Sequence, residues 1–241
     1  MTLAFVQDMS LCMECQGCRV ACQTQNGLPA EQTFVRLRFH DSGTYPRAQH
    51  HVARITCQHC LKPTCVSHCP TGATYVGESG LVHFNADKCI GCGWCEKRCP
   101  FEVPKVVQGK ALRCTGCESL TEYGKEPACV STCISGALAF GPREEMLQRA
   151  EARVAALKVR HPNAQVYSPK SVGGTGLIWV LRDKPEVYGL PLNPRVRPTL
   201  SLHDMVQPGT QVSAAGGVLL AGLGWIIARR MQLSETKGGE E

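Results

Sequence analysis

The 16 cysteines of this 241-residue chain fall into four tight groups of four, and this grouping constrains the fold more than any other feature. The groups are Cys12, Cys15, Cys18 and Cys22; Cys57, Cys60, Cys65 and Cys69; Cys89, Cys92, Cys95 and Cys99; and Cys114, Cys117, Cys129 and Cys133. A chain of this length can bury a core without disulfides. Cysteines three residues apart on a tight turn aim their sulfurs at a common point, whereas a disulfide demands a specific Cβ geometry. The pattern therefore favours metal centres over disulfides.

The third group, CIGCGWCEKRCP at residues 89–100, discriminates between zinc and iron. A structural zinc site usually has two CxxC pairs separated by a longer loop, which only the fourth group partly resembles. The third group instead matches the CxxCxxCxxxCP run of bacterial iron-sulfur proteins, whose fourth cysteine ligates the other cluster of a pair. Pro100 stiffens the backbone beside that fourth cysteine, Cys99. The 16 thiolates therefore predict four 4Fe-4S clusters, with zinc in one site as the alternative.

The net charge argues against a nucleic-acid partner. The formal charge of +6 counts every cysteine as neutral. Each oxidised cluster with its four thiolates is roughly a dianion, so four clusters bring the loaded protein to about −2. No basic run interleaved with aromatic residues is present, and nucleic-acid binding is therefore not expected.

The cysteine-rich part, residues 1–141, is followed by a change of pattern. Within it, the apolar, glycine-containing segments at 71–84 and 135–141 predict short β-hairpins. Residues 142–160 predict an amphipathic helix that packs on the cluster domain, with Pro142 at its start and Leu147, Ala150, Val154 and Leu157 on one face. Residues 161–211 are rich in proline and lose periodicity, which predicts an extended arm lying over a partner.

Near the C-terminus, residues 212–228 form 17 uncharged positions, followed by Arg229 and Arg230. This length is the lower limit for crossing a bilayer, so a transmembrane helix is predicted at 212–230, with a buried core helix as the alternative and a polar tail at 231–241. The small residues Gly217, Ala221, Gly224 and Ala228 share one face and predict close packing against a membrane partner.

The basic residues that follow the span favour a cytoplasmic C-terminus. The cluster domain is then expected on the periplasmic side of the inner (cytoplasmic) membrane. Because residues 1–12 lack the features of a signal peptide, the protein would cross already folded, carried by a partner.

The segments after the clusters narrow the family. EPACVSTCISGALAFGPREEML (126–147), the AEARVAALK helix (150–158), VGGTGLIWVL (172–181), VYGLPLNP (187–194) and the C-terminal span resemble, in order and spacing, the iron-sulfur beta subunit of membrane-bound respiratory formate dehydrogenases. That subunit belongs to the wider family of four-cluster ferredoxin-like subunits. The resemblance implies an α+β fold with two pseudo-duplicated bacterial ferredoxin-like modules, each with two 4Fe-4S clusters, followed by the helix, the arm and one transmembrane helix.

The resemblance also implies which cysteines share a cluster. The first and fourth groups would hold one pair of clusters, and the second and third groups the other pair. The four ligand sets would be Cys12, Cys15, Cys18 and Cys133; Cys22, Cys114, Cys117 and Cys129; Cys57, Cys60, Cys65 and Cys99; and Cys69, Cys89, Cys92 and Cys95.

No catalytic constellation is recognisable in the sequence, because no nucleophile has a base beside it and no cofactor loop is present. His59 and His68, inside the second group, are expected to pack, with cluster tuning as the alternative, and Trp94 is expected to shield a cluster. The chain is therefore interpreted as a non-catalytic electron-transfer subunit.

By resemblance, the donor would be a molybdenum or tungsten pterin catalytic (alpha) subunit oxidising formate. The acceptor would be a membrane cytochrome b (gamma) subunit that reduces quinone. The same role in a hydrogenase or another molybdopterin oxidoreductase is the alternative, and a membrane-tethered zinc-binding or scaffold protein is the alternative of a different class.

Overall fold

A computed structural model of the chain describes residues 2–195, which belong to a compact unit running from Met1 to Arg197. The transmembrane helix predicted at 212–230, the tail at 231–241 and the end of the predicted arm lie outside the described residues. No helix between residues 2 and 195 is long and apolar enough to cross a membrane. Helices and strands are mixed along the chain, as the α+β prediction requires.

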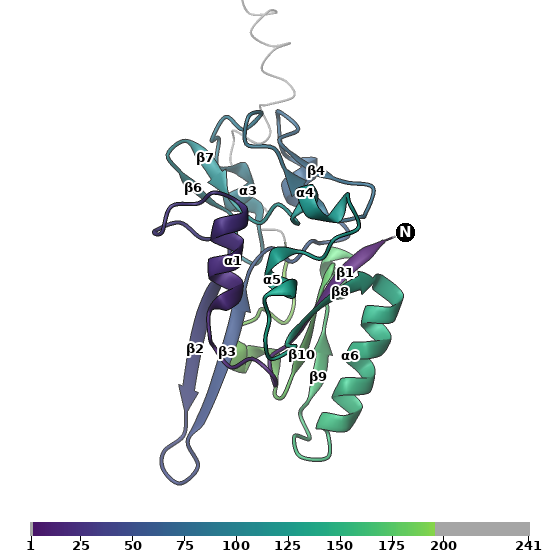
Figure 1. The fold of residues 1–241 in the computed structure, drawn as a ribbon. Coiled ribbons are helices and arrows are strands. Elements are labelled where there is room, and N and C mark those ends of the chain that lie inside the picture. The colour runs from purple at the N-terminus through teal and green to yellow at the C-terminus, as the bar shows by residue number, and fades with distance from the viewer. Residues whose placement is uncertain (1, 196–241) are drawn as a thin grey trace, which may run out of the picture. The chain divides into compact units, whose positions relative to one another are not determined.

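A four-stranded sheet in the order β8-β1-β10-β9 forms the centre of this unit (Figure 1). Its strands are β1 (Leu3–Asp8), β8 (Leu138–Pro142), β9 (Gln165–Tyr167) and β10 (Leu177–Leu181). β1 pairs in parallel with β10, with Phe5 opposite Leu177, and antiparallel with β8. All five residues of β10 are buried, which suits a strand covered on both faces of the sheet. The sheet therefore brings together the N-terminus, the end of the cysteine-rich part and the segment that follows the long helix.

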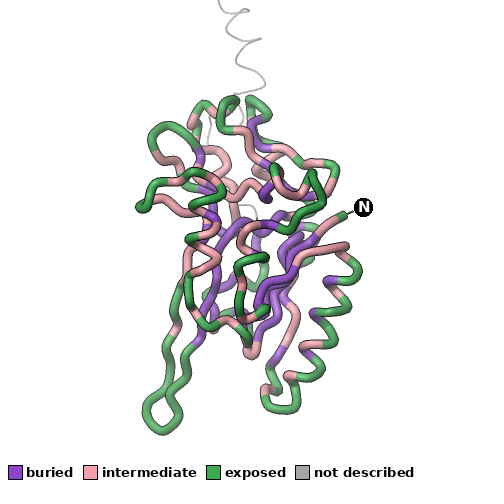
Figure 2. The backbone as a smooth tube through the Cα atoms, viewed as in Figure 1, coloured by how far each residue is buried: buried purple, intermediate pink, exposed green. Residues whose placement is uncertain are grey.

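The two faces of the sheet pack against different partners (Figure 2). One face packs against α6 (Arg143–Leu157), which buries Met146, Ala150 and Val154. The helix predicted from Pro142 is therefore present, and Leu147 and Leu157 are partly buried at its edge. The opposite face contributes Phe5 and Trp179 to a core that also includes cysteines of all four sequence groups. The sheet thus lies between α6 and the cysteine-rich part.

The prediction of an extended arm at 161–211 is wrong for residues 165–190. Gln165–Tyr167 and Leu177–Leu181 are strands of the central sheet, and Tyr188 and Leu190 are buried in the core. Two short 3-10 turns, η1 (Lys170–Val172) and η2 (Pro185–Tyr188), connect and follow these strands. Pro162 lies in a turn and Pro185 begins η2, so the frequency of proline was a misleading signal for this part of the chain.

Three antiparallel hairpins complete the sheet structure of residues 2–195: β2 (Arg36–Ser42) with β3 (Gln49–Ile55), β4 (Thr74–Val76) with β5 (Val82–Phe84), and β6 (Lys105–Val107) with β7 (Lys110–Leu112). The hairpin predicted at 71–84 is confirmed by β4 and β5. The hairpin predicted at 135–141 is wrong, because its strand β8 pairs with β1 from the other end of the chain. The β2–β3 hairpin projects from the unit, and its tip is exposed (Figure 2).

Five short helices carry or adjoin the cysteine groups: α1 (Gly17–Gln25), α2 (Thr64–Ser67), α3 (Trp94–Arg98), α4 (Glu118–Thr121) and α5 (Ala128–Ser131). α1 packs against α5, so the first cysteine group meets the fourth. α2 packs against α3, so the second group meets the third. The cysteines are therefore brought together by helix pairs from distant parts of the sequence.

Candidate metal centre

Set 1, made of Cys12, Cys15, Cys18 and Cys133, lines one cavity. Three of its cysteines come from the loop before α1 and the first turn of that helix, and Cys133 follows α5. Met9 and Leu138 close the inner side of the cavity. Cys15 is exposed, so this cavity lies at the surface of the described unit.

Set 2, made of Cys22, Cys114, Cys117 and Cys129, lines a second cavity. Cys22 lies on α1 and Cys129 on α5, so the packing of these helices brings sets 1 and 2 together. Phe5 and Leu177 of the central sheet line the same cavity. Burial raises the pKa of the Cys22 thiol to about 12, and the neighbouring charges of Cys129 and Cys117 add to the shift.

Set 3, made of Cys57, Cys60, Cys65 and Cys99, has a buried Cys57 and three partly exposed cysteines. Burial raises the pKa of Cys60, and the charges of Cys57, Cys99 and Cys65 raise it further, so the four sulfurs are close neighbours. Cys57 also lines the cavity of set 2, and its charge raises the pKa of Cys114 after the dominant effect of burial. Sets 2 and 3 are therefore adjacent.

Set 4, made of Cys69, Cys89, Cys92 and Cys95, lines a cavity between the loop 89–93, α3 and the β4–β5 and β6–β7 hairpins. Trp94 lines the same cavity, which agrees with a shielding role, and the guanidinium of Arg98 lies 5.2 Å from its ring. Burial raises the pKa of Cys95 to about 11, and the charge of Cys65 from set 3 contributes. Cys92 is exposed, so the cavity of set 4, like that of set 1, lies at the surface of the described unit.

The four sets follow one another in the order 1, 2, 3, 4, because Arg54 lines the cavities of sets 1 and 2, Cys57 of set 3 lines the cavity of set 2, and the charge of Cys65 of set 3 acts on Cys95 of set 4. The cavities of sets 1, 2 and 4 bring together the cysteines that the resemblance groups, and the assignment of cysteines to clusters stays a prediction. All 16 cysteines are free thiols. Between residues 2 and 195, no three ligating side chains meet closely enough to hold a single metal ion. Crowded, buried thiols resist ionisation because the thiolates repel one another and lose water, and a positively charged metal group reverses this effect. Four convergent thiols around each site are the donor set that a 4Fe-4S cluster takes.

Backbone N–H groups also point at the cysteine sulfurs. Gly116 N–H donates to the Cys114 sulfur at 3.4 Å, and Ala111 N–H donates to the Cys89 sulfur at 3.5 Å. Left-handed residues, including Gly91 with φ of 68° and Gly116 with φ of 70°, turn the loops so that this is possible. Such hydrogen bonds stabilise negative charge on sulfur.

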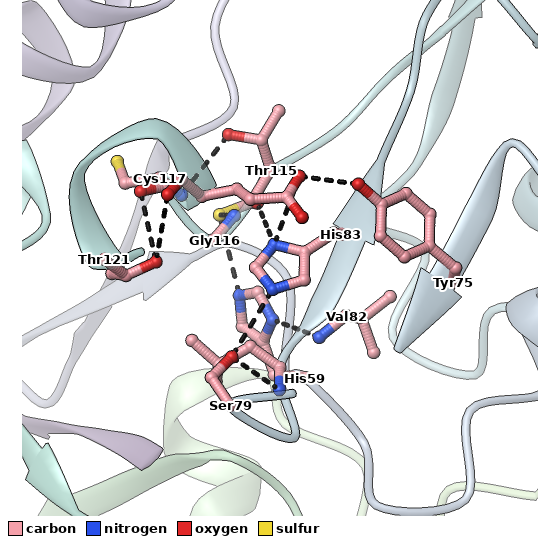
Figure 3. Close-up of polar contacts among 12 residues, drawn as sticks. His59, Tyr75, Ser79, Val82, His83, Thr115, Gly116, Cys117 and Thr121 are labelled. Atoms are coloured by element: carbon pink, nitrogen blue, oxygen red, sulfur yellow. Dashed lines mark hydrogen bonds and ion pairs between the residues drawn. The ribbon is translucent and has the colours of Figure 1, made fainter. Parts of the chain in front are cut away.

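His59 is 1 % exposed and lines the cavity of set 2 together with Cys57 of set 3. Figure 3 shows its ring beside Val82 and Gly116. Val82 N–H donates to its Nδ1 at 3.1 Å, so the proton of the neutral ring is on Nε2. Nε2 lies 3.6 Å from the Cys114 sulfur and donates to it. Burial and the nearby Arg113 lower the pKa of His59 to about 3, so the ring stays neutral. The sequence favoured a simple packing role for His59. Its contact with the Cys114 sulfur instead favours the alternative, which is tuning of a neighbouring cluster.

His68, the other histidine of the second group, faces away from the cysteines. Its exposed ring contacts the Thr64 carbonyl at 2.9 Å and the Ser67 hydroxyl at 3.0 Å. Sequence reasoning missed Arg54 and Arg113, two buried arginines beside the cysteines. Neither arginine stands in a recognisable motif, although Arg113 directly precedes Cys114 and Arg54 closely precedes Cys57.

Comparison with known proteins agrees with this geometry. Residues 49–143 match the 4Fe-4S dicluster domain family. The formate dehydrogenase iron-sulfur subunit of Haemophilus influenzae is 37 % identical over 244 residues, covering 91 % of this chain and 78 % of the relative. The iron-sulfur subunit of the nitrate-inducible formate dehydrogenase of Escherichia coli is 37 % identical over 218 residues, covering 81 % and 74 %.

The chain belongs to the family of formate dehydrogenase iron-sulfur subunits. A more distant relative, the thiosulfate reductase electron transfer subunit PhsB of Salmonella typhi, is 37 % identical over 145 residues, covering 58 % of this chain and 76 % of its own length. This iron-sulfur subunit therefore has a ferredoxin-like domain, its cofactor is the 4Fe-4S cluster, and its role is electron transfer.

Proposed function

We propose that this chain relays electrons along four 4Fe-4S clusters, one held by each of sets 1 to 4. The observation that carries the proposal is the row of four cysteine sets, each drawn from two distant sequence groups and each adjacent to the next. When bound, each cluster accepts and releases one electron at a time. The chain contributes the ligands, the backbone N–H donors and the apolar enclosure that exclude water from the inner two sets.

The two ends of the row suit exchange of electrons with partner proteins. Set 1 includes the exposed Cys15, and set 4 includes the exposed Cys92. Large apolar side chains are exposed next to each end: Met13 and Ile134 near set 1, and Ile90 near set 4. Apolar surface around an accessible terminal site favours docking of another subunit.

The partners proposed are a molybdenum or tungsten formate dehydrogenase catalytic subunit as donor and a membrane cytochrome b subunit, which reduces quinone, as acceptor. The family supports the first partner, because the relatives are named as formate dehydrogenase subunits. The second candidate function is the same relay in a hydrogenase or another molybdopterin oxidoreductase. The similarity to a thiosulfate reductase subunit supports this candidate.

The membrane attachment is proposed from the sequence. Residues 212–230 would cross the inner membrane with the C-terminus in the cytoplasm and the cluster domain on the periplasmic side. The face formed by Gly217, Ala221, Gly224 and Ala228 would contact the membrane subunit.

The decisive experiment is formate-dependent dye reduction by the native complex, purified anaerobically in mild detergent through a tag on this chain. Activity that is lost when the complex is split supports the formate relay. A brown complex that is silent with formate and active with hydrogen or another substrate keeps the relay and overturns the formate assignment. A colourless preparation without iron overturns the cluster proposal itself.

A further inference from the structure

Two arginines are buried among the cysteines, far from solvent. Arg54, in β3, is 4 % exposed, and Arg113, directly after β7, is 1 % exposed. Among residues 2–195, neither has a carboxylate within ion-pair distance. Burying an arginine without a counter-charge is costly, so each must be balanced by another negative group.

Arg54 lies between sets 1 and 2. It lines both of their cavities. Cys18, in set 1, and Cys129, in set 2, line these same cavities beside Arg54, and their charges act on its guanidinium. One cation is therefore shared between two neighbouring sets.

Arg113 has the same relation to sets 3 and 4. Its NH2 group donates to the Cys57 sulfur at 3.6 Å, and the charge of Cys65 in the same set also acts on it. Its NH1 group donates to the hydroxyl of Thr74, which lines the cavity of set 4. A second cation is therefore shared between the other two sets.

The two arginines are held in matching ways. NH1 of Arg54 donates to the Gln7 side-chain oxygen at 3.2 Å, and NH1 of Arg113 donates to the Thr74 hydroxyl at 3.2 Å. In both residues, Nε is buried and has no hydrogen-bond partner within residues 2–195. One hydrogen bond from NH1 to a neutral side chain therefore holds each guanidinium, and no carboxylate neutralises its charge beside the two cysteine sets.

We propose that Arg54 and Arg113 are equivalent positioning residues, each shared by the two clusters of one module and each raising the reduction potentials of that pair. The inference rests on the proposed assignment of clusters to sets 1 to 4. A nearby cation stabilises the more negative, reduced state, and hydrogen bonds to sulfur act in the same direction. Arginine suits the position because it stays charged when buried and can donate to several acceptors from one fork.

Each arginine acts on one module, whereas the cysteine that follows it in the sequence belongs to the other module. Arg54 closely precedes Cys57, in set 3, yet acts on sets 1 and 2. Arg113 directly precedes Cys114, in set 2, yet acts on sets 3 and 4. A substitution therefore tests a contact between modules of the fold, not a disturbance of the adjacent ligand.

The test uses the full-length chain, purified anaerobically with its clusters intact, and the variants Arg54→Gln and Arg113→Gln. Redox titration followed by electron paramagnetic resonance gives the cluster midpoints of each protein. We expect Arg54→Gln to shift two midpoints to more negative values and Arg113→Gln to shift the other two. The two variants are each other's controls, because the subsets that move should not overlap, whichever signal belongs to which cluster.

The lysine variants Arg54→Lys and Arg113→Lys keep the charge and are used if a glutamine variant loses iron. They are expected to load four clusters and to shift the same midpoints by a smaller amount. Fully loaded variants whose midpoints match the wild type, or which shift all four midpoints equally, would overturn the inference. Iron and sulfide analysis of the wild type tests the cluster assignment separately, since failure there shows before any variant is compared.

Discussion

At the scale of single residues, the chemistry of His59 is decided by one backbone donor. Because Val82 N–H occupies Nδ1, the ring must present Nε2–H to the Cys114 sulfur. Phe5 stacks on the other side of the ring at a centroid distance of 5.4 Å and limits its movement. The histidine is thus a fixed, neutral donor at the junction between the two modules.

Replacing His59 with phenylalanine keeps the ring volume and removes this donor. We expect the midpoint of one cluster, that of set 2, to fall by about 60 mV, because a hydrogen bond to a charged acceptor contributes about 1.5 kcal/mol and about 59 mV corresponds to a tenfold change for one electron. The measurement is redox titration of the loaded chain.

The matched control is His68→Phe, in the same cysteine group, where the ring contacts Thr64 and Ser67 instead of sulfur. Its midpoints should equal those of the wild type. Equal shifts in both variants would show that any substitution in this loop disturbs the clusters and that the His59 hydrogen bond has no special role.

At the scale of elements, the cysteine loops depend on close backbone contacts with neighbouring hairpins. Gly91, between Cys89 and Cys92, has φ of 68°, and a Cβ built on it would lie 2.3 Å from the carbonyl oxygen of Gly109 in the β6–β7 turn. Gly93 has a similar φ of 77°, but a Cβ there would meet nothing within 4 Å. The two glycines therefore separate the cost of a left-handed backbone from the cost of a clash.

We expect Gly91→Ala to be clearly more damaging than Gly93→Ala. Both substitutions should lower the free energy of unfolding by about 1–2 kcal/mol, because an L-residue is strained in the left-handed region. Gly91→Ala should lower it by roughly 1–3 kcal/mol more, because its Cβ overpacks against the backbone. The temperature at which the visible absorbance of the clusters is lost, measured anaerobically, compares them. Equal temperatures for the two variants would contradict the close approach of the loop and the hairpin.

The elements also show what sequence reasoning could and could not reach. Helix α6 was predictable because its apolar positions repeat at helical spacing within one segment and prolines mark its limits. Strand β10 was missed, although LIWVL is an uninterrupted apolar run of the kind that forms a buried parallel strand. Its partner β1 lies more than 160 residues away, as the pairing of Phe5 with Leu177 shows, and no local pattern encodes such a pairing.

The same distinction applies to the candidate site. The spacing within CIGCGWCEKRCP indicates three ligands for one cluster and one for another, because that rule is local. Which groups meet depends on α1 packing against α5 and α2 against α3, and only the family resemblance supplied that pairing. Arg54 and Arg113 were unpredictable because a lone arginine near a strand is ordinarily a surface residue.

At the scale of the whole molecule, the segment after α6 supports the second cysteine group. The isolated bridge between Cys60 and Thr175 lies among three backbone hydrogen bonds: Leu61 N–H to the Gly174 carbonyl at 3.0 Å, Gly176 N–H to the His59 carbonyl at 2.7 Å, and Leu177 N–H to the Gln58 carbonyl at 3.0 Å. Trp179 Nε1 also donates to the Gln58 side chain at 2.8 Å. The cysteine-rich part therefore depends on residues that follow it in the sequence.

Two truncations test this dependence together with the proposed membrane attachment. A chain ending at Arg197 keeps the compact unit, so we expect it to load clusters as the full chain does and to fractionate away from membranes. A chain ending at Arg160 lacks β9 and β10. One edge of β1 then has no hydrogen-bonded neighbour, and the loop at Cys57 and Cys60 loses its backbone hydrogen-bond partners. We expect that shorter chain to aggregate or to lose most of its iron.

Iron content and membrane fractionation, measured for both truncations and the full chain, separate the two expectations. If the chain ending at Arg160 kept its full iron content, β9 and β10 would be dispensable for the cysteine sets. If the chain ending at Arg197 stayed with the membrane fraction in the absence of partner subunits, residues 198–241 would not be the anchor. Loaded clusters in a released chain would instead assign electron transfer to residues 1–197 and membrane attachment to the segment after them, as the uncharged run at 212–228 indicates.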